Sequence, residues 1–173
     1  MATARRTYCY LCATKLEPQS DFSWKCPSCQ YTQYENPKPA TEVVLMQDGK
    51  ILASERGAEP HKGRFDMPGG FIECNETIEE GLLRELDEEL GISSEDITGL
   101  RYLRSYSCLY PFGKEVYYLV VMVYVATLGA GVKVEAKDDV ASLRWVSEAE
   151  IDSVLWSLDH HLKNARTAFR NSE

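Results

Sequence analysis

The chain has 173 residues, which allows one domain of ordinary size and a small appendage. Its 44% hydrophobic and 27% charged residues are typical of a soluble globular protein, and its net charge of −8 argues against a general affinity for nucleic-acid backbones or anionic membranes. Residues 1–6 are followed by cysteines instead of an apolar core, and the longest apolar run, residues 119–126, is too short to span a membrane. We therefore expect a cytoplasmic protein without a secretion signal.

Four of the six cysteines lie within the first 29 residues, in the pattern C-x2-C-x13-C-x2-C. In a chain without a secretion signal, two such pairs favour a tetrahedral zinc site over two disulfides or redox pairs, because disulfides are rare in the cytosol. A site closed by four thiolates is structural, and its metal would stabilise a segment too short to fold by burial alone. We predict that residues 1–36 form a small zinc ribbon with the ligands Cys9, Cys12, Cys26 and Cys29. Four Lys/Arg against three Asp/Glu give this segment no basic face for nucleic acid.

The remaining residues, 37–173, read as one α/β domain. Two prolines one residue apart make residues 35–39 an extended connector. Turn-rich loops are expected over residues 57–69 and 111–114, and Asp48-Gly49 indicates a hairpin. A capping box of Ser147 and Glu150 predicts one helix, and residues 160–170 form another. Strands are predicted over 41–46, 51–55, 71–73, 100–109, 116–128 and 141–146, which together give an α/β sandwich with a mixed sheet.

A further helix is predicted to begin after Thr77, which forms a T-x-x-E capping box with Glu80, and to stop at Gly91. At helical spacing its leucines share one core-facing stripe.

Three carboxylates of this helix, those of Glu85, Glu88 and Glu89, share a stripe at the edge of the buried face. At about 5 Å and an effective dielectric near 20, each pair repels by about 3 kcal/mol, so the helix needs a counter-charge. A hard divalent cation such as Mg²⁺ prefers oxygen ligands and removes the repulsion. We therefore assign the three residues as ligands of Mg²⁺ or Mn²⁺ rather than as a solvated face, with one of them also a candidate base. Such a site suits phosphoryl chemistry.

The spacing from Gly70 to Ile92 reads G-x5-E-x7-R-E-U-x-E-E-x-G-U, where U is a bulky aliphatic residue. The stretch resembles, at every fixed position, the signature of the Nudix hydrolases. The resemblance implies an α/β/α Nudix fold and a metal-dependent pyrophosphohydrolase for a nucleoside diphosphate linked to another group. It also implies that Arg84 pairs with Glu76 to brace the loop against the helix, and that the backbone at Gly70 is a metal ligand. Asn75 stands where members commonly have glycine, and asparagine is the next-best residue for a left-handed turn.

A zinc ribbon followed by such a domain resembles the NADH pyrophosphatase family, over roughly residues 8–150. This implies NAD(H) as substrate and a homodimer formed through the ribbon. The family's S-Q-P-W-x-F-P-x-S pattern is only echoed in residues 105–113. ADP-ribose hydrolases carry a proline after the signature, which Pro111 matches imperfectly, so NAD(H) and ADP-ribose are both favoured. Tyr106, Tyr110 and Phe112 are candidates to stack on a base, with strand packing as the alternative.

Two more residues are candidates for the site. The resemblance implies a further metal-binding or base carboxylate near Asp139, for which Glu135 and Asp138 are rivals and a solvated loop is the alternative. Arg56, at the end of a strand facing the signature loop, is a candidate phosphate contact or a surface ion pair. Two other functions stay open, a nucleotide-sensing module without catalysis and a hydrolase that removes dNTPs or other nucleotides.

Overall fold

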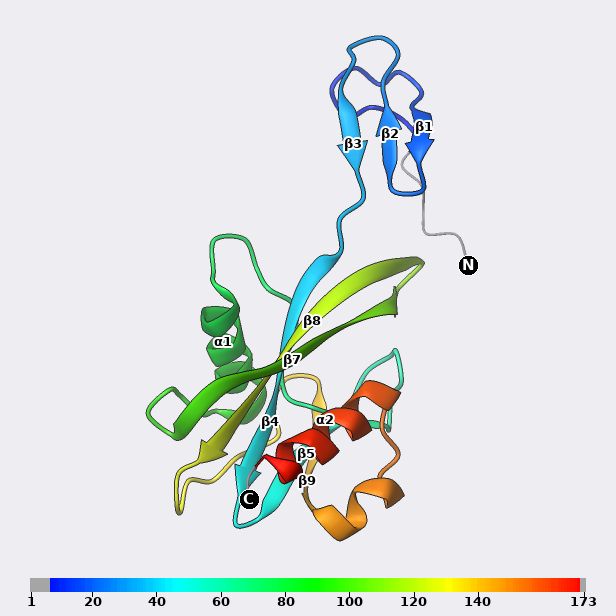
Figure 1. Ribbon diagram of the computed structural model, residues 1–173. Helices are drawn as coiled ribbons and strands as arrows, with labels where there is room; N and C mark the ends of the chain where they lie inside the picture. Colours follow the sequence, from blue (N-terminus) through cyan, green and yellow to red (C-terminus); the bar gives the residue numbers. More distant parts are fainter. Residues whose placement is uncertain (1–6, 172–173) are drawn as a thin grey trace. The chain divides into compact units, whose positions relative to one another are not determined.

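The computed structural model describes residues 7–171 (Figure 1). Residues 1–6, from which the lack of a secretion signal was inferred, lie outside the described residues. The chain divides into two compact units, one of Met1–Lys38 with Leu109–Leu119 and one of Pro39–Cys108 with Val120–Glu173. In the part of the chain that is described, no helix is long and apolar enough to cross a membrane.

The first unit contains a three-stranded antiparallel sheet of β1 (Glu17–Ser20), β2 (Ser23–Lys25) and β3 (Thr32–Tyr34). Its core is small and consists of Leu16, Trp24 and two cysteines, with Tyr31 packed against them. Residues Leu109–Leu119, the tip of a long hairpin, belong to the same unit. There the ring of Tyr118 meets that of Phe22 edge-on at 5.5 Å. A core of this size makes the unit dependent on another source of stability.

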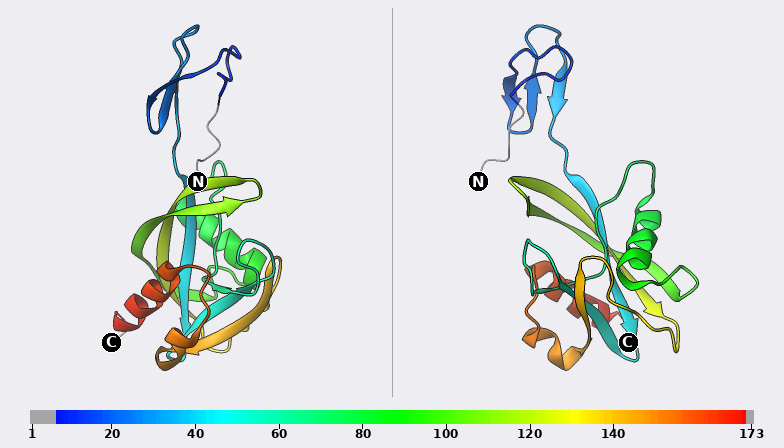
Figure 2. Two further views of the ribbon diagram at one scale, coloured as in Figure 1. Left: turned by 90° about the vertical axis from the view of Figure 1, so that its right-hand side faces the viewer. Right: turned by 180° about the vertical axis from the view of Figure 1, so that it is seen from behind.

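The second unit is built on a mixed sheet with strand order β6-β5-β4-β8-β7, and β9 pairs with the other edge of β5. The strands are β4 (Lys38–Gln47), β5 (Lys50–Arg56), β6 (Phe65–Asp66), β7 (Ile97–Phe112), β8 (Glu115–Leu128) and β9 (Val140–Ser147). Helices α1 (Ile78–Leu90) and α2 (Asp159–Arg170) lie on opposite sides of the sheet, as Figures 1 and 2 show. The predicted α/β sandwich with a mixed sheet is confirmed.

The main core lies between α1 and the sheet. Leu82, Leu86 and Leu90 of α1 are fully buried against apolar residues of β4, β5 and β8, including Val43 and Leu52. Burying a leucine side chain contributes about 1.5 to 3 kcal/mol. This packing fixes the rotation of α1 about its axis and therefore the direction in which its carboxylates point.

Two local predictions were wrong, and a third element is shorter than expected. β7 continues through Pro111, and the turn is at Gly113 and Lys114, because an edge strand tolerates the missing N–H of proline. Residues 71–73 form no strand, and Phe71 makes only a single bridge with Ala40. The helix expected from Ser147 is present with its capping box, as a short 3-10 helix, Glu148–Ser153; the chain then returns to an extended form and reaches β6 through a parallel bridge.

Candidate functional site

Local sequence chemistry sets the two ends of α1. The Thr77 side chain accepts the N–H of Glu80 at 3.2 Å, and the Glu80 carboxylate accepts the N–H of Thr77 at 2.8 Å. Gly91 ends the helix in the left-handed conformation, with φ of 68°. The predicted capping box and glycine stop are therefore both present.

Arg84 organises the loop in front of α1. Its Nη2 and Nε bind the two oxygens of Glu76 at 2.9 and 3.1 Å, and Nη2 also donates to the Phe71 carbonyl at 2.9 Å. Its Nη1 donates to Glu85 at 2.9 Å and to Glu88 at 3.0 Å. These bonds account for all five N–H donors of a guanidinium. Arg84 thus contacts the acidic stripe as well as Glu76, a contact that the helical spacing alone did not reveal.

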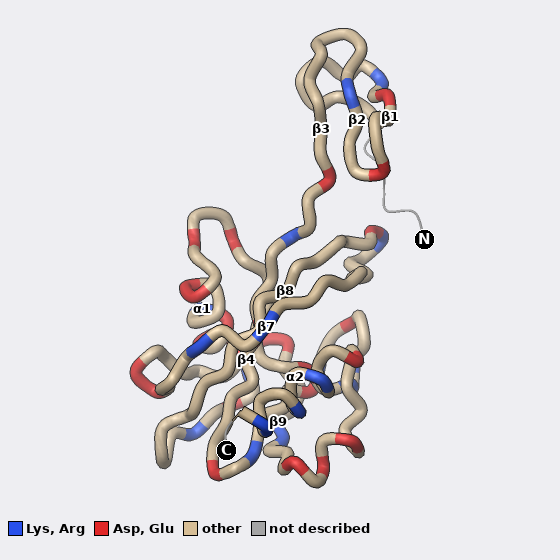
Figure 3. The backbone as a smooth tube through the Cα atoms, viewed as in Figure 1, with Lys and Arg blue, Asp and Glu red and all other residues tan. Residues whose placement is uncertain are grey.

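Glu89 is the most buried of the signature acids, with 8% of its surface exposed. Its Oε2 accepts the backbone N–H of Gly69 at 3.0 Å. Burial raises the pKa of Glu89 to about 9, the Gly69 hydrogen bond opposes this, and the carboxylates of Glu85 and Asp139 add to it. Burial also raises the pKa of Glu85, against the effect of Arg84. Acidic positions line α1 and the loop before it (Figure 3).

The three signature carboxylates are not gathered at one point. Glu85 and Glu88 turn to Arg84, and Glu89 turns to Gly69. Among residues 7–171, the only group of side chains placed to hold a metal ion is that of the four cysteines, whose ligand atoms all lie within 4.8 Å of one another.

Gly70 lies directly against the carboxylate of Glu85. A β-carbon at Gly70 would be 2.5 Å from Cδ and 2.8 Å from Oε2 of Glu85. The Gly70 carbonyl accepts the N–H of Thr41 at 2.9 Å, which ties this loop to β4. Glycine is therefore required here for a close approach of backbone to a carboxylate.

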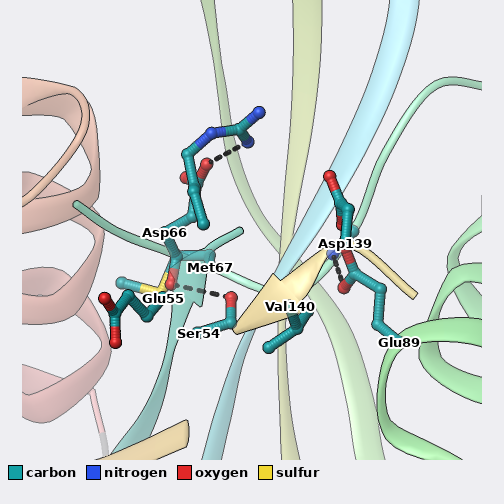
Figure 4. Close-up of a pocket in the computed structure, with 9 residues that line it drawn as sticks. Ser54, Glu55, Asp66, Met67, Glu89, Asp139 and Val140 are labelled. Carbon is teal, nitrogen blue, oxygen red and sulfur yellow. Dashed lines mark hydrogen bonds and ion pairs between the residues drawn. The ribbon is translucent and has the colours of Figure 1, made fainter. Parts of the chain in front are cut away.

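A pocket with about 230 Å³ of empty space, part of it open to solvent, lies beside the C-terminal half of α1. In Figure 4, Glu89 from α1 and Asp139 from the loop before β9 lie side by side across from Asp66. The pocket is lined by Ser54, Glu55, Arg56, Asp66, Met67, Gly69, Glu89, Asp139 and Val140.

The loop that carries Asp139 is fastened to the end of α1. The N–H groups of Glu135 and Lys137 donate to the carbonyls of Leu90 and Glu89 at 3.2 and 2.9 Å. The Asp139 carbonyl accepts the N–H of Gly57 at 2.7 Å. Of the three acids considered from sequence, Asp139 is the one that lines the pocket.

Arg56 also lines the pocket, at the end of β5. Its Nη1 pairs with Oδ2 of Asp66 at 2.9 Å and its Nε donates to the Pro60 carbonyl at 2.6 Å. The side chain is therefore held in an ion pair and faces the pocket at the same time.

The three aromatic candidates lie in different surroundings. Tyr106 is buried, donates its hydroxyl to Glu42 at 3.0 Å and stacks on His160 at 4.1 Å. Tyr106 therefore packs inside the protein, which was the alternative to stacking on a base. Tyr110 and Phe112 belong to the first unit, where Phe112 is 51% exposed and stacks on Tyr117 at 5.4 Å.

Sequence reasoning assigned no role to the histidines, yet His161 lies in a buried polar cluster with Glu42 and Asp66. A signal for this cluster was available, because Glu42 is a charged residue inside a strand whose neighbours are all apolar or small.

The four N-terminal cysteines come together as predicted by their spacing. The Sγ atoms of Cys9 and Cys29 lie 3.6 Å apart, those of Cys12 and Cys26 lie 3.5 Å apart, and all four are free thiols. Hydrogen bonds from the side chain and backbone of Thr14 lower the pKa of the Cys12 thiol to about 6.

The two C-x2-C turns share one backbone form. Ala13 and Gln30, the residues after each second cysteine, have φ of 56° and 64°. Their N–H groups donate to the carbonyls of Cys9 and Cys26 at 2.8 and 3.0 Å. Two such turns facing each other are compatible with one tetrahedral zinc ion.

Comparison with known proteins agrees with this geometry. The NUDIX domain model matches residues 36–169. The ADP-ribose pyrophosphatase of Methanocaldococcus jannaschii is 44% identical over 63 residues, which are 36% of this chain and 37% of that protein. The NAD-capped RNA hydrolase NudC of Photobacterium profundum is 25% identical over 151 residues, 86% of this chain and 53% of that protein. The chain thus spans between 37% and 53% of the length of these curated relatives.

Among solved structures, that of a NUDIX hydrolase from Nitrosomonas europaea has a TM-score of 0.68 at 22% identity and covers 96% of this chain and 93% of its own. This similarity shows a shared fold. Because the family model matches well over half of the residues, the chain belongs to the NUDIX domain family.

Proposed function

We propose that the protein is a metal-dependent pyrophosphohydrolase that cleaves the diphosphate of a nucleoside diphosphate linked to another group. The observation that carries the proposal is the pocket beside α1, where the buried Glu89 lies beside the exposed Asp139. Arg56 lines the same pocket. A diphosphate is a dianion, so an acidic pocket accepts it only if cations are also present.

The donor atoms are of the kind that fits a hard divalent cation, although Arg84 and the Gly69 N–H hold the carboxylates apart in this structure. Carboxylate oxygens of Glu85, Glu88 and Glu89 are the donors that Mg²⁺ and Mn²⁺ prefer, and the backbone at Gly70 lies against one of them. These four residues would hold the metal. When bound, such an ion offsets charge on the diphosphate oxygens and lowers the pKa of a bound water.

The protein's own groups then have separable tasks. Arg84 fixes the orientation of Glu85 and Glu88 and, through Glu76, the loop that carries Gly70. Glu89 and Asp139 are the candidates to accept a proton from water, because both lie in the pocket. Arg56 is the candidate to bind a phosphate oxygen.

We favour NAD(H) or ADP-ribose as substrate. The names of the two curated relatives, one for ADP-ribose and one for NAD-capped RNA, support this choice. The test is incubation of the protein with NADH, ADP-ribose, an NAD-capped RNA oligonucleotide and dNTPs, with Mg²⁺ or Mn²⁺. Nucleoside monophosphate released from NADH or ADP-ribose is the expected result. Tight binding without any monophosphate product would instead favour a nucleotide-sensing module.

The chain offers a matched pair of variants for the metal site. Glu88→Gln should reduce turnover at least about a hundredfold, because it takes away one charged ligand of the metal ion. Asp87→Asn removes the same charge from the exposed neighbour on the same helix and should leave turnover unchanged. Equal loss in both variants would contradict the assignment.

We further propose that residues 1–36 are a zinc ribbon, that residues 37–173 are the catalytic domain, and that the protein is a cytoplasmic homodimer without affinity for membranes or, in general, nucleic acid. The free thiols within 4.8 Å of one another support the zinc site. Light scattering tests the dimer, since a mass near 19.6 kDa would mean a monomer.

A further inference from the structure

A buried polar cluster joins α2 to the sheet. The ring of His161 is only 2% exposed, and its Nε2 lies 2.9 Å from Oδ1 of Asp66 and 3.2 Å from Oε2 of Glu42. Its Nδ1 lies 3.2 Å from the hydroxyl of Ser157. Carboxylate oxygens accept hydrogen bonds, so Nε2 must carry a proton to bind both of them. His161 therefore donates an N–H that lies between the two acids.

The cluster reaches the pocket through Asp66. While Oδ1 of Asp66 faces His161, its Oδ2 accepts a hydrogen bond from Nη1 of Arg56 at 2.9 Å. Asp66 and Arg56 both line the pocket, and His161 does not. The charges of Glu42, His161, Asp66 and Arg56 alternate in sign along this chain of contacts.

Glu42 cannot take over the role of His161. An ionised carboxylate has no hydrogen to donate to Asp66, and Glu42 itself accepts the Tyr106 hydroxyl at 3.0 Å and the Asn164 amide at 2.5 Å. Asp66 therefore depends on His161 for the fixed position of its second oxygen. If this contact is lost, the Asp66 carboxylate can rotate, and the acceptor of the Arg56 Nη1 group rotates with it, while the Pro60 carbonyl holds only Nε.

We propose that His161 is a positioning residue for Arg56. This positioning role rests on the proposed function in one respect, namely that Arg56 binds a phosphate oxygen of the substrate. His161 acts from the far side of Asp66, outside the pocket, and holds the guanidinium in the direction that the diphosphate requires. Its loss should weaken substrate binding more than it slows the chemical step.

The first experiment is titration of ADP-ribose, with Mg²⁺, into proteins that also carry Glu88→Gln to prevent turnover. His161→Gln should raise the dissociation constant about tenfold or more, as loss of an oriented charged hydrogen bond does. Asn164→Ala is the matched control, because it removes another α2 contact to Glu42 and leaves His161, Asp66 and Arg56 in place. It should lower stability without changing the dissociation constant.

A double-mutant cycle separates positioning from a general loss of structure. In an Arg56→Ala background, His161→Gln should change the dissociation constant by less than about twofold, since the group that it positions is gone. An undiminished effect of His161→Gln in that background, or an equal effect of Asn164→Ala, would overturn the proposal.

A ligand-free measurement keeps the inference testable if the proposed function fails. The Nη1–H signal of Arg56, the group that donates to Asp66, is identified by its loss in Arg56→Ala and should be sharp in the NMR spectrum of the wild-type protein and of Asn164→Ala. It should broaden or vanish in His161→Gln. An unchanged signal in His161→Gln would refute the positioning role, whereas failure of all nucleotides to bind would refute only the proposed function.

Discussion

The carboxylate of Glu85 occupies the space in which Gly70 would carry a β-carbon, 2.5 Å from the Glu85 Cδ atom. Gly70→Ala therefore forces a flexible carboxylate to move and leaves the backbone in place. Because a misplacement of about 1 Å can cost about a hundredfold in rate, we expect turnover to fall by about that factor while the melting temperature stays nearly unchanged. Steady-state kinetics and calorimetry on the same variant check this.

The neighbouring glycine is the control for that variant. A β-carbon on Gly69 would lie against the carbonyl of Thr41 and 2.7 Å from the Cα of Glu42, and Gly69 has φ of 138°. Both are backbone conflicts, so Gly69→Ala should destabilise the protein by at least about 1 to 3 kcal/mol. If the two variants lose stability equally, the close approach at Gly70 is not specific to the carboxylate.

Gly81 offers a test of the brace between the loop and α1. Replacing a glycine within a helix by alanine normally stabilises the protein by about 1 kcal/mol. Here the added β-carbon would lie 2.7 Å from both Oε1 of Glu76 and Cδ1 of Ile72. Gly81→Ala should therefore bring no gain in stability and should reduce turnover about tenfold or more, because Glu76 must move away from Arg84. A more stable variant with full turnover would contradict this expectation.

The buried His161 predicts a dependence of stability on alkaline pH. Its ring faces the carboxylates of Asp66 and Glu42 and the hydroxyl of Ser157, with the edge of Trp156 nearby. Burial alone would lower the pKa of His161, but Asp66 and Glu42 overcome this and raise it from 6.5 to about 10. Because the folded-state pKa is the higher one, the stabilisation is complete below pH 6.5 and disappears as the pH rises towards about 10.

Urea unfolding of the wild-type protein and of His161→Gln checks this dependence. At about pH 6 the variant should be less stable by about 3 to 5 kcal/mol, the usual cost of breaking a buried charged pair. The difference should shrink steadily towards about pH 10. A difference that is constant over this range would mean that His161 is neutral in the folded protein.

The four thiols predict one zinc ion per chain. Cys12→Ser should reduce zinc content by at least about half and unfold the first unit, whose apolar core contains only a few residues. Cys74→Ser is the control, because Cys74 is an exposed free thiol in the loop before α1. It should leave metal content unchanged. Elemental analysis and circular dichroism measure the two effects, and equal zinc content in the three proteins would exclude the site.

Sequence reasoning succeeded where the chemistry is local. The ends of α1 follow from Thr77, Glu80 and Gly91 because capping involves residues within one helical turn. The spacing of the cysteines likewise predicted a cluster that lies within two short turns.

What escaped prediction depends on residues far apart in the chain. β6 exists because Phe65 and Asp66 pair with β5, and no local pattern in a polar loop indicates this. The bond from Asn164 to Glu42 spans 122 positions, and the two carboxylates that contact His161, those of Glu42 and Asp66, are also far from it in the chain. A single sequence shows that Glu42 is an unusual residue for a buried strand, but it does not show which residue neutralises its charge.

The attachment of the loop at Glu135 and Lys137 to the last carbonyls of α1 has one further consequence. The peptide group of Lys137 is bonded to the carbonyl of Glu89, the same residue whose side chain enters the pocket. A substitution in this loop that is meant to alter substrate choice would therefore also disturb the position of Glu89, a candidate metal ligand. If Glu89 holds the metal as proposed, we expect substitutions in this loop to change metal affinity as well as substrate choice.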